Sequence, residues 1–267
     1  MLRYILPKNQ NIAKEVFWLA YPVVVSNLSR VLMSVFDVAM VGRLGPPALA
    51  ATGMGGMMFW GALSLTLGIR TAVQTVSSRR LGQKLDKQSG TAFHNGIYMA
   101  TVYGVPVSLL GWAFVDNIVP FFVNDAQATP LAIEYTSVVF LSLAFSAYSF
   151  VFQGFYTGVE KTKIHMVVTI ISNVINLYLN AGLIYGSVGV RLFINETVPN
   201  LWFLSFLWDW AEFPAMGVRG AAISTLIASF WMVFHYTAYL FSKDIKRRFS
   251  IFSFSYDKKM MLTQIRL

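Results

Sequence analysis

The sequence contains no cysteine, few histidines and little charge. The absence of cysteine excludes structural disulfides, thiol catalysis and cysteine-ligated metal sites. The three histidines, His94, His165 and His235, are far apart and do not share the spacing of a metal motif. Charged residues make up 12% of the chain, whereas soluble domains carry about 25%. With 56% hydrophobic residues, the chain has more apolar surface than one aqueous core can bury, so we expect an integral membrane protein.

Six long apolar runs are the main pattern in the sequence. A transmembrane helix needs about 20 mostly apolar residues, whereas strands of a membrane β-barrel show short alternating segments. The runs are too long and too continuously apolar for strands, which predicts an all-α fold, a polytopic membrane helix bundle. The predicted spans are residues 16–41, 49–76, 97–114, 132–152, 165–185 and 216–241, with 120–123 in a loop.

The positive charge is distributed unevenly between the loops. A net charge of +9 would by itself suit nucleic-acid binding, but the basic residues gather in segments on one side of the six spans. By the positive-inside rule this side, with both termini, is cytoplasmic. We therefore expect a multi-pass protein of the cytoplasmic (inner) membrane whose surroundings are lipid and which has no nucleic-acid partner.

Two segments differ from ordinary loops. Residues 187–215 form a long outer connection rich in tryptophan and phenylalanine, which favours an interfacial amphipathic segment at the headgroups. A hairpin lid with no role in lipid binding is the alternative. Residues 242–267 are interpreted as a basic cytoplasmic linker toward a missing C-terminal lobe, and they end in what resembles the start of another helix. Residues 1–15 are then a cytoplasmic N-terminal segment, and 16–241 form the six-helix transmembrane lobe.

The first span contains an acid, Asp37. A carboxylate at membrane depth costs several kcal/mol unless it is solvated or paired. Arg30 and Ser34 share its helix face, and Arg30 lies about 10 Å from Asp37 along the axis. Because side chains lean toward the helix N-terminus, Arg30 points away from Asp37. We expect this face to line a cavity where Asp37 binds a cation or a proton; a structural ion pair is the alternative.

A polar stripe runs along the fifth span. Thr169, Asn173, Asn176 and Asn180 are spaced i, i+4, i+7 and i+11, which places them on one helix face. Amides supply both donors and acceptors, so this stripe can line an aqueous cavity or coordinate a cation. Hydrogen bonding between helices, worth about 0.6 kcal/mol per contact, is the alternative.

Together these segments resemble the multidrug and toxic compound extrusion (MATE) transporters. Residues 35–45, VFDVAMVGRLG, look like that family's first-helix acid and the turn after it. Residues 158–163, GVEKTK, resemble its fourth cytoplasmic turn, and Gln74 fits the end of the second helix. Residues 173–186 and 217–225, the latter GVRGAAIST, are similar to its fifth and sixth helices. The resemblance covers nearly the whole chain.

The resemblance implies the N-terminal lobe of a twelve-helix secondary active transporter. Such a protein exports organic cations and drugs by alternating access, driven by H⁺ or Na⁺ antiport, and needs no cofactor. Its expected partner is a C-terminal lobe of the same or a longer chain. The coupling ion, with Na⁺ the one metal considered, is assigned to Asp37 together with Asn176 and Asn180. The candidate cavity residues are Arg30, Ser34, Asn173, Thr225 and Gln74.

Two departures from the family pattern bear on the mechanism. Some members have Asp where this chain has Asn180, and one carboxylate fewer suits a proton or a loosely held sodium ion. Arg30 stands where a neutral polar residue is more usual. Arg30 and Arg70 keep open a flippase for lipid-linked sugars, because a pyrophosphate needs cationic partners. An uncoupled six-helix channel or structural subunit is a further alternative. An enzyme is not expected, since no catalytic dyad, paired acid or metal motif occurs on facing spans.

Overall fold

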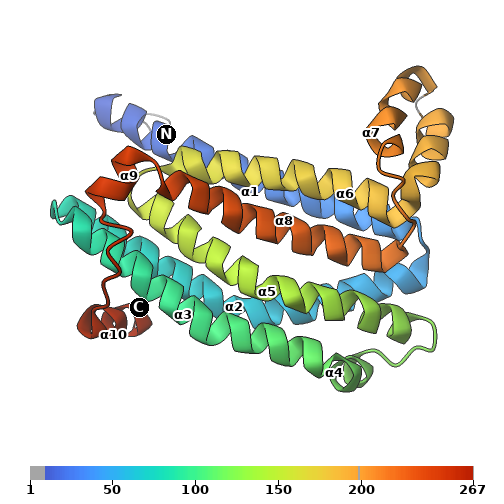
Figure 1. Ribbon diagram of the computed structural model, residues 1–267, viewed down its shortest axis with the longest axis horizontal. Coiled ribbons are helices and arrows are strands. Elements are labelled where there is room, and N and C mark those ends of the chain that lie inside the picture. Colours follow the sequence, from blue (N-terminus) through green and yellow to red (C-terminus); the bar gives the residue numbers. More distant parts are fainter. Residues whose placement is uncertain (1–9, 198, 267) are drawn as a thin grey trace, which may run out of the picture.

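The structure, a computed structural model, describes residues 10–197 and 199–266, which form a bundle of long helices (Figure 1). Within these described residues, six helices are long and apolar enough to cross a membrane, as the apolar runs predict. These six are α1 (Gln10–Gly42), α2 (Pro46–Gly82), α3 (Asp86–Ala113), α5 (Ala128–Gly158), α6 (Thr162–Thr197) and α8 (Gly217–Leu240). The short ones are α4 (Val115–Phe122), the 3-10 helix η2 (Pro199–Ser205), α7 (Phe206–Asp209), α9 (Lys243–Arg248) and α10 (Lys258–Arg266).

The helices extend past the predicted spans because their polar ends are stabilised by other contacts. Helix α3 begins at Asp86 rather than at 97, and its polar first turns contain the buried residues Ser89, His94 and Asn95. The predicted loop at 120–123 is also wrong in part, because Pro120 lies within α4. There, Val115 and Val119 are buried against the start of α5, which stabilises a short helix that length and hydropathy do not reveal.

Helix α5 is the centre of the bundle. It packs against α2, α3 and α8, and Figure 1 shows it between α8 and the pair formed by α2 and α3. Leu143, Ala147, Val151 and Phe155 on α5 have no solvent exposure. Glycine allows the close approach of α2, since a Cβ at Gly154 would overlap a backbone carbonyl of α2.

Helix α1 lies at the edge of the bundle and packs chiefly against α6. The side chains of Val24, Leu28, Val31 and Val35 form a stripe along it that is more than half exposed. The chain then turns sharply at Gly45, whose φ of 104° is accessible to glycine at little cost, and enters α2.

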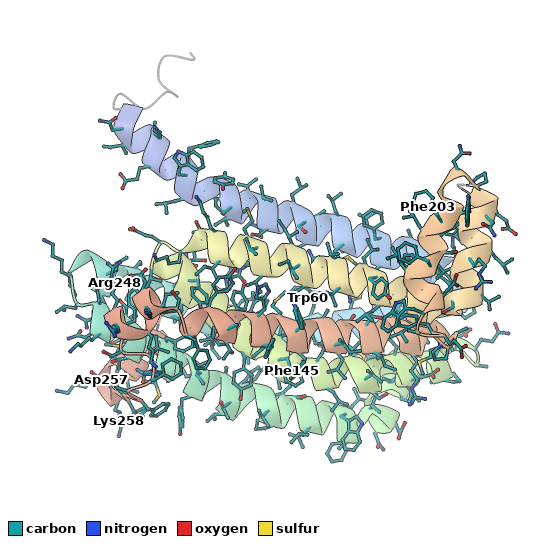
Figure 2. All side chains as sticks on the ribbon, turned by 45° about the horizontal axis from the view of Figure 1, so that its top comes forward. Trp60, Phe145, Phe203, Arg248, Asp257 and Lys258 are labelled. Atoms are coloured by element: carbon teal, nitrogen blue, oxygen red, sulfur yellow. The ribbon has the colours of Figure 1, made fainter. Side chains whose placement is uncertain are left out.

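Residues 187–197 belong to α6, and residues 199–209 return beside them, so this region has the hairpin shape of the alternative, while its predicted place at the headgroups stays a prediction. Helix α6 kinks at Gly186, where φ is 73° and ψ is 164°, and continues as a helix. The returning arm, η2 and α7, is attached to it because Ser187 donates from its side chain to the Trp208 carbonyl at 2.6 Å. Trp208 donates in turn to the carbonyl of Tyr178 at 2.9 Å. We call this the hairpin end of the bundle; Phe203 marks it in Figure 2.

Residues 242–266, predicted as a linker, pack against the end of the bundle opposite the hairpin end. We call this the tail end, and Arg248 and Asp257 mark it in Figure 2. Arg248 donates to Asp86 at 2.8 Å, and this hydrogen bond raises the pKa of Arg248. His94 contacts the carbonyl of Ile251 through Nε2 at 2.7 Å, and Asn95 donates to the carbonyl of Asp257 at 3.1 Å. The polar start of α3 is therefore the docking surface for residues 248–264.

Candidate functional site

A chain of amide hydrogen bonds connects α1 to α6. Asn180 donates through Nδ2 to Oδ1 of Asp37 at 2.6 Å and to Oδ1 of Asn176 at 3.2 Å. Farther along the same face, Asn173 donates to the hydroxyl of Ser29 at 2.8 Å. The asparagine stripe predicted on the fifth span thus faces the helix that contains the acid. These hydrogen bonds link α1 to α6, and much of the apolar surface of α1 stays exposed.

Asn180 presents an unused acceptor beside the acid. Its side chain is 1% exposed, and its Oδ1 is buried without a hydrogen-bond partner among the described residues. Buried acceptors normally have a partner, and each exception needs an explanation. The Asp37 carboxylate and amide oxygens of Asn176 and Asn180 are the hard ligands that a sodium ion prefers. Alternatively, the same amide can accept the proton of a neutral Asp37 after rotating.

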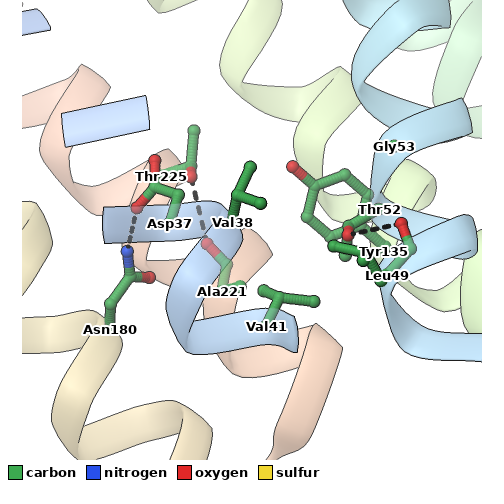
Figure 3. A pocket seen from close by; sticks show the side chains of 10 residues that line it. All are labelled: Asp37, Val38, Val41, Leu49, Thr52, Gly53, Tyr135, Asn180, Ala221 and Thr225. Atoms are coloured by element: carbon green, nitrogen blue, oxygen red, sulfur yellow. Dashed lines mark hydrogen bonds between the residues drawn. The ribbon is translucent and has the colours of Figure 1, made fainter. Parts of the chain in front are cut away.

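A cavity adjoins the carboxylate of Asp37. Figure 3 shows Asp37 of α1 between Asn180 of α6 and Thr225 of α8, with Tyr135 of α5 among the other lining residues. The cavity has a volume of about 130 Å³, which exceeds what one water molecule needs. Thr225 donates its hydroxyl to the carbonyl of Ala221 at 3.0 Å and leaves its oxygen facing the cavity. Asp37 is therefore in reach of water.

A second cavity has a volume of about 260 Å³, and we call it the central cavity. It brings most of the predicted site residues together. Its lining residues come from α1, α2, α5, α6 and α8. The predicted residues that line it are Arg30, Ser34, Asp37, Asn173, Asn176 and Thr225. It shares Asp37, Tyr135 and Thr225 with the smaller cavity, so the two cavities are adjacent.

Gln74 lies outside these cavities. The backbone of Gln74 packs against Gly158 of α5, close to the tail end. The position of a residue near a helix end does not indicate which neighbouring helix its side chain faces. The residues missed by sequence reasoning are aromatic: Phe59, Trp60 and Tyr135 line the central cavity. In spans that are apolar all round, nothing in the periodicity separates an aromatic residue that lines a cavity from one that faces lipid.

Arg30 and Asp37 face the same cavity without forming a salt bridge. Within residues 10–197 and 199–266, three salt bridges occur, and all involve residues outside the membrane-spanning core. The partners are Lys161 with Asp244, Arg191 with Asp209, and Arg248 with Asp86. Side chains on a helix lean toward its N-terminus, so Arg30 is expected to extend away from Asp37. The acid is hydrogen-bonded but has no permanent cationic partner in the described chain.

Known proteins share this architecture. The family model MatE matches residues 22–181. Probable multidrug resistance protein NorM from Thermotoga maritima is 26% identical over 229 residues, which are 84% of this chain and 44% of that protein. The protein of the same name from Listeria monocytogenes is 23% identical over 241 residues, which are 90% of this chain and 47% of the relative. The chain spans about half the length of these curated relatives.

Solved structures show the same fold. One, described as the outward-facing conformation of a multidrug resistance MATE family transporter, has a TM-score of 0.78 at 21% identity. The similarity covers 95% of this chain and 51% of that one. A MOP superfamily transporter from Pyrococcus furiosus has a TM-score of 0.77 at 21% identity, over 95% of this chain and 50% of that one.

The family model matches more than half of the chain, and the six candidate membrane helices of the described residues fit the fold of the solved transporters. The chain is a multi-pass membrane protein that belongs to the MatE family, and its six spans correspond to the N-terminal lobe of a MATE transporter.

Proposed function

We propose that this chain is the ion-coupling lobe of an antiporter that exports organic cations. The observation that carries the proposal is Asp37, a carboxylate at membrane depth that borders a cavity and has amide rather than cationic partners. An acid in such a place binds whichever cation reaches it, a coupling ion or a positively charged substrate. The two cannot occupy one carboxylate together, and this competition is the basis of exchange.

The proposed cycle begins with Asp37 ionised and hydrogen-bonded to Asn180. Arrival of H⁺ or Na⁺ removes the unpaired charge and weakens the attraction for a cationic substrate. The Asn180 amide then either rotates toward the proton or turns its free oxygen to the sodium ion. Because α1 is attached to α6 by a few polar links, their rearrangement can shift α1 at small cost. Alternating access follows if substrate and coupling ion favour different positions of α1.

The orientation and the partner belong to the same proposal. The basic tail end lies at the cytoplasm and the hairpin end at the outer face of the inner membrane. A second six-helix lobe, covering the remaining half of the curated relatives' length, completes the transporter. The substrate path then passes between two lobes, as in other transporters with internal repeats.

Replacing Asp37 tests the proposal. In the complete transporter reconstituted in vesicles, we expect Asp37→Asn to reduce proton- or sodium-driven export of a cationic dye to background. Asp116→Asn, at an exposed acid in the short α4, is the matched control and should leave export intact. Undiminished ion-dependent export by Asp37→Asn would refute the role of Asp37. Downhill flux that needs no ion gradient would instead indicate a channel.

A further inference from the structure

A third cavity, which we call the inner cavity, lies next to the central cavity on the side of the tail end. It has a volume of about 170 Å³ and shares Arg30, Trp60 and Asn173 with the central cavity. Its lining contains no carboxylate, and Arg30 is the one charged residue in that lining. The charge in the lining of this cavity is therefore positive, whereas the charge in the lining of the cavity beside Asp37 is negative.

A buried network forms one wall of this cavity. Nε2 of Gln153 lies 2.7 Å from Nε2 of His165, and Nδ1 of His165 lies 2.6 Å from the hydroxyl of Tyr236. With the Gln153 amide in this orientation its nitrogen donates, so Nε2 of His165 accepts and the ring proton is assigned to Nδ1. The histidine is thus neutral, and its partners are neutral as well. The wall supplies dipoles and no charge that balances Arg30.

A serine hydroxyl is also available to a ligand in this cavity. Ser149 is 5% exposed, and its Oγ has no hydrogen-bond partner among the described residues. Ser149 lines this cavity, so its hydroxyl can donate into it. Arg70 of α2, a second arginine within the spans, is not among the residues that line this cavity. Neither Arg30 nor Arg70 forms a salt bridge within the described chain.

We propose that this inner cavity binds an anionic group, a carboxylate or a phosphate, carried by the transported molecule. A guanidinium presents five donors in a fork that matches the oxygens of such groups. The inner cavity lies along α1 from the Asp37 site, about 10 Å from it by helix rise. The inference rests on the proposed function, because it takes the adjacent cavities as the substrate path. A substrate would then place its cationic part beside Asp37 and its anionic part beside Arg30.

The cysteine-free chain permits a direct measurement of the local potential. A reporter thiol is introduced as Ser146→Cys in the inner cavity, or as Thr52→Cys in the cavity beside Asp37. Each is labelled in nanodiscs with an anionic and a cationic thiosulfonate of equal size. We expect the ratio of anionic to cationic labelling rates to be at least tenfold higher at Ser146→Cys. Adding Arg30→Gln should remove most of this difference, whereas Arg30→Lys should retain it.

Ligand protection then tests binding itself. Benzoate, benzamide and inorganic phosphate are compared for their ability to slow labelling of Ser146→Cys by a neutral reagent. We expect benzoate or phosphate to slow it severalfold, benzamide to have no effect, and Arg30→Gln to abolish protection. Equal protection by benzoate and benzamide, or anion protection that survives Arg30→Gln in folded protein, would overturn the inference.

Two comparisons assign the source of the anion and separate this inference from the proposed function. Labelling that is already slow in phosphatidylglycerol nanodiscs but fast in phosphatidylcholine would identify a lipid headgroup as the anion. Protection by soluble anions in both lipids would identify a free organic acid or phosphate. Labelling requires no transport, so an anion site can be found even if Asp37→Asn leaves export unchanged.

Discussion

Helices α5 and α1 have nearly the same apolar character but opposite places in the bundle. In the most apolar 18 residues of each, 67% are buried in α5 and 6% in α1. Helix α5 is fixed by apolar contact with three neighbours, whereas α1 is joined to α6 by amide hydrogen bonds. The acid is on the loosely packed helix. The comparison indicates that packing around α5 holds the lobe together, and under the proposed function α1 is the helix that responds to the ion.

The largest expected effect is on α5. Gly154→Leu introduces a side chain where a Cβ already overlaps the backbone of Arg70, so α2 and α5 must separate. We expect a loss of folded-state stability of about 3 kcal/mol or more, measured by thermal unfolding of the purified protein in detergent. Gly53→Leu is the control, since nothing lies within 4 Å of a Cβ there. Similar stability of both variants would contradict the central role of α5.

An intermediate effect is expected where α1 meets α6. Asn180→Ala removes the 2.6 Å hydrogen bond to Asp37, and hydrogen bonds to charged groups contribute about 1.5–3 kcal/mol. We expect ion-driven export by the complete transporter to fall about tenfold and the unfolding temperature to fall by a few degrees. Asn173→Ala removes a link to Ser29 and leaves Asp37 bonded, so its effect on export should be smaller. Equal effects would mean that the stripe only holds the helices together.

The smallest effect is expected at the tail end, outside both helices. Lys161 forms a salt bridge with Asp244 at 2.9 Å, and its hydrogen bond and charge lower the pKa of Asp244. A lowered folded-state pKa contributes stability above the unfolded value of about 3.9, and this contribution is lost as pH falls through the folded value. Asp244→Asn should therefore lower the unfolding temperature slightly at pH 7, because the pair is exposed, and the difference from the unmutated protein should disappear below about pH 4. A large change at pH 7 would show that this exposed pair fixes the tail.

The number of spans and the polar faces were predictable because each depends on one helix at a time. Apolar length gives the spans, and the i, i+4, i+7 spacing gives the faces with Asp37 and Asn176. The polar start of α3 was missed because His94 and Asn95 are buried by the distant tail. The hairpin was assigned to a loop because its helix follows a kink at Gly186 that contact with Phe213 and Ala215 stabilises.

The sequence by itself determined the membrane class, the six helices and the chemistry on each face, since these follow from residue type and helix geometry. Only the tertiary structure decided that Asn180 contacts Asp37 and that Gln74 packs against α5. It also decided that Arg30 lines the inner cavity, which has no acid in its lining. The physical reason is that a helix fixes the angles between its own side chains but not the rotation of its neighbours. That rotation is set by packing contacts between residues far apart in the chain.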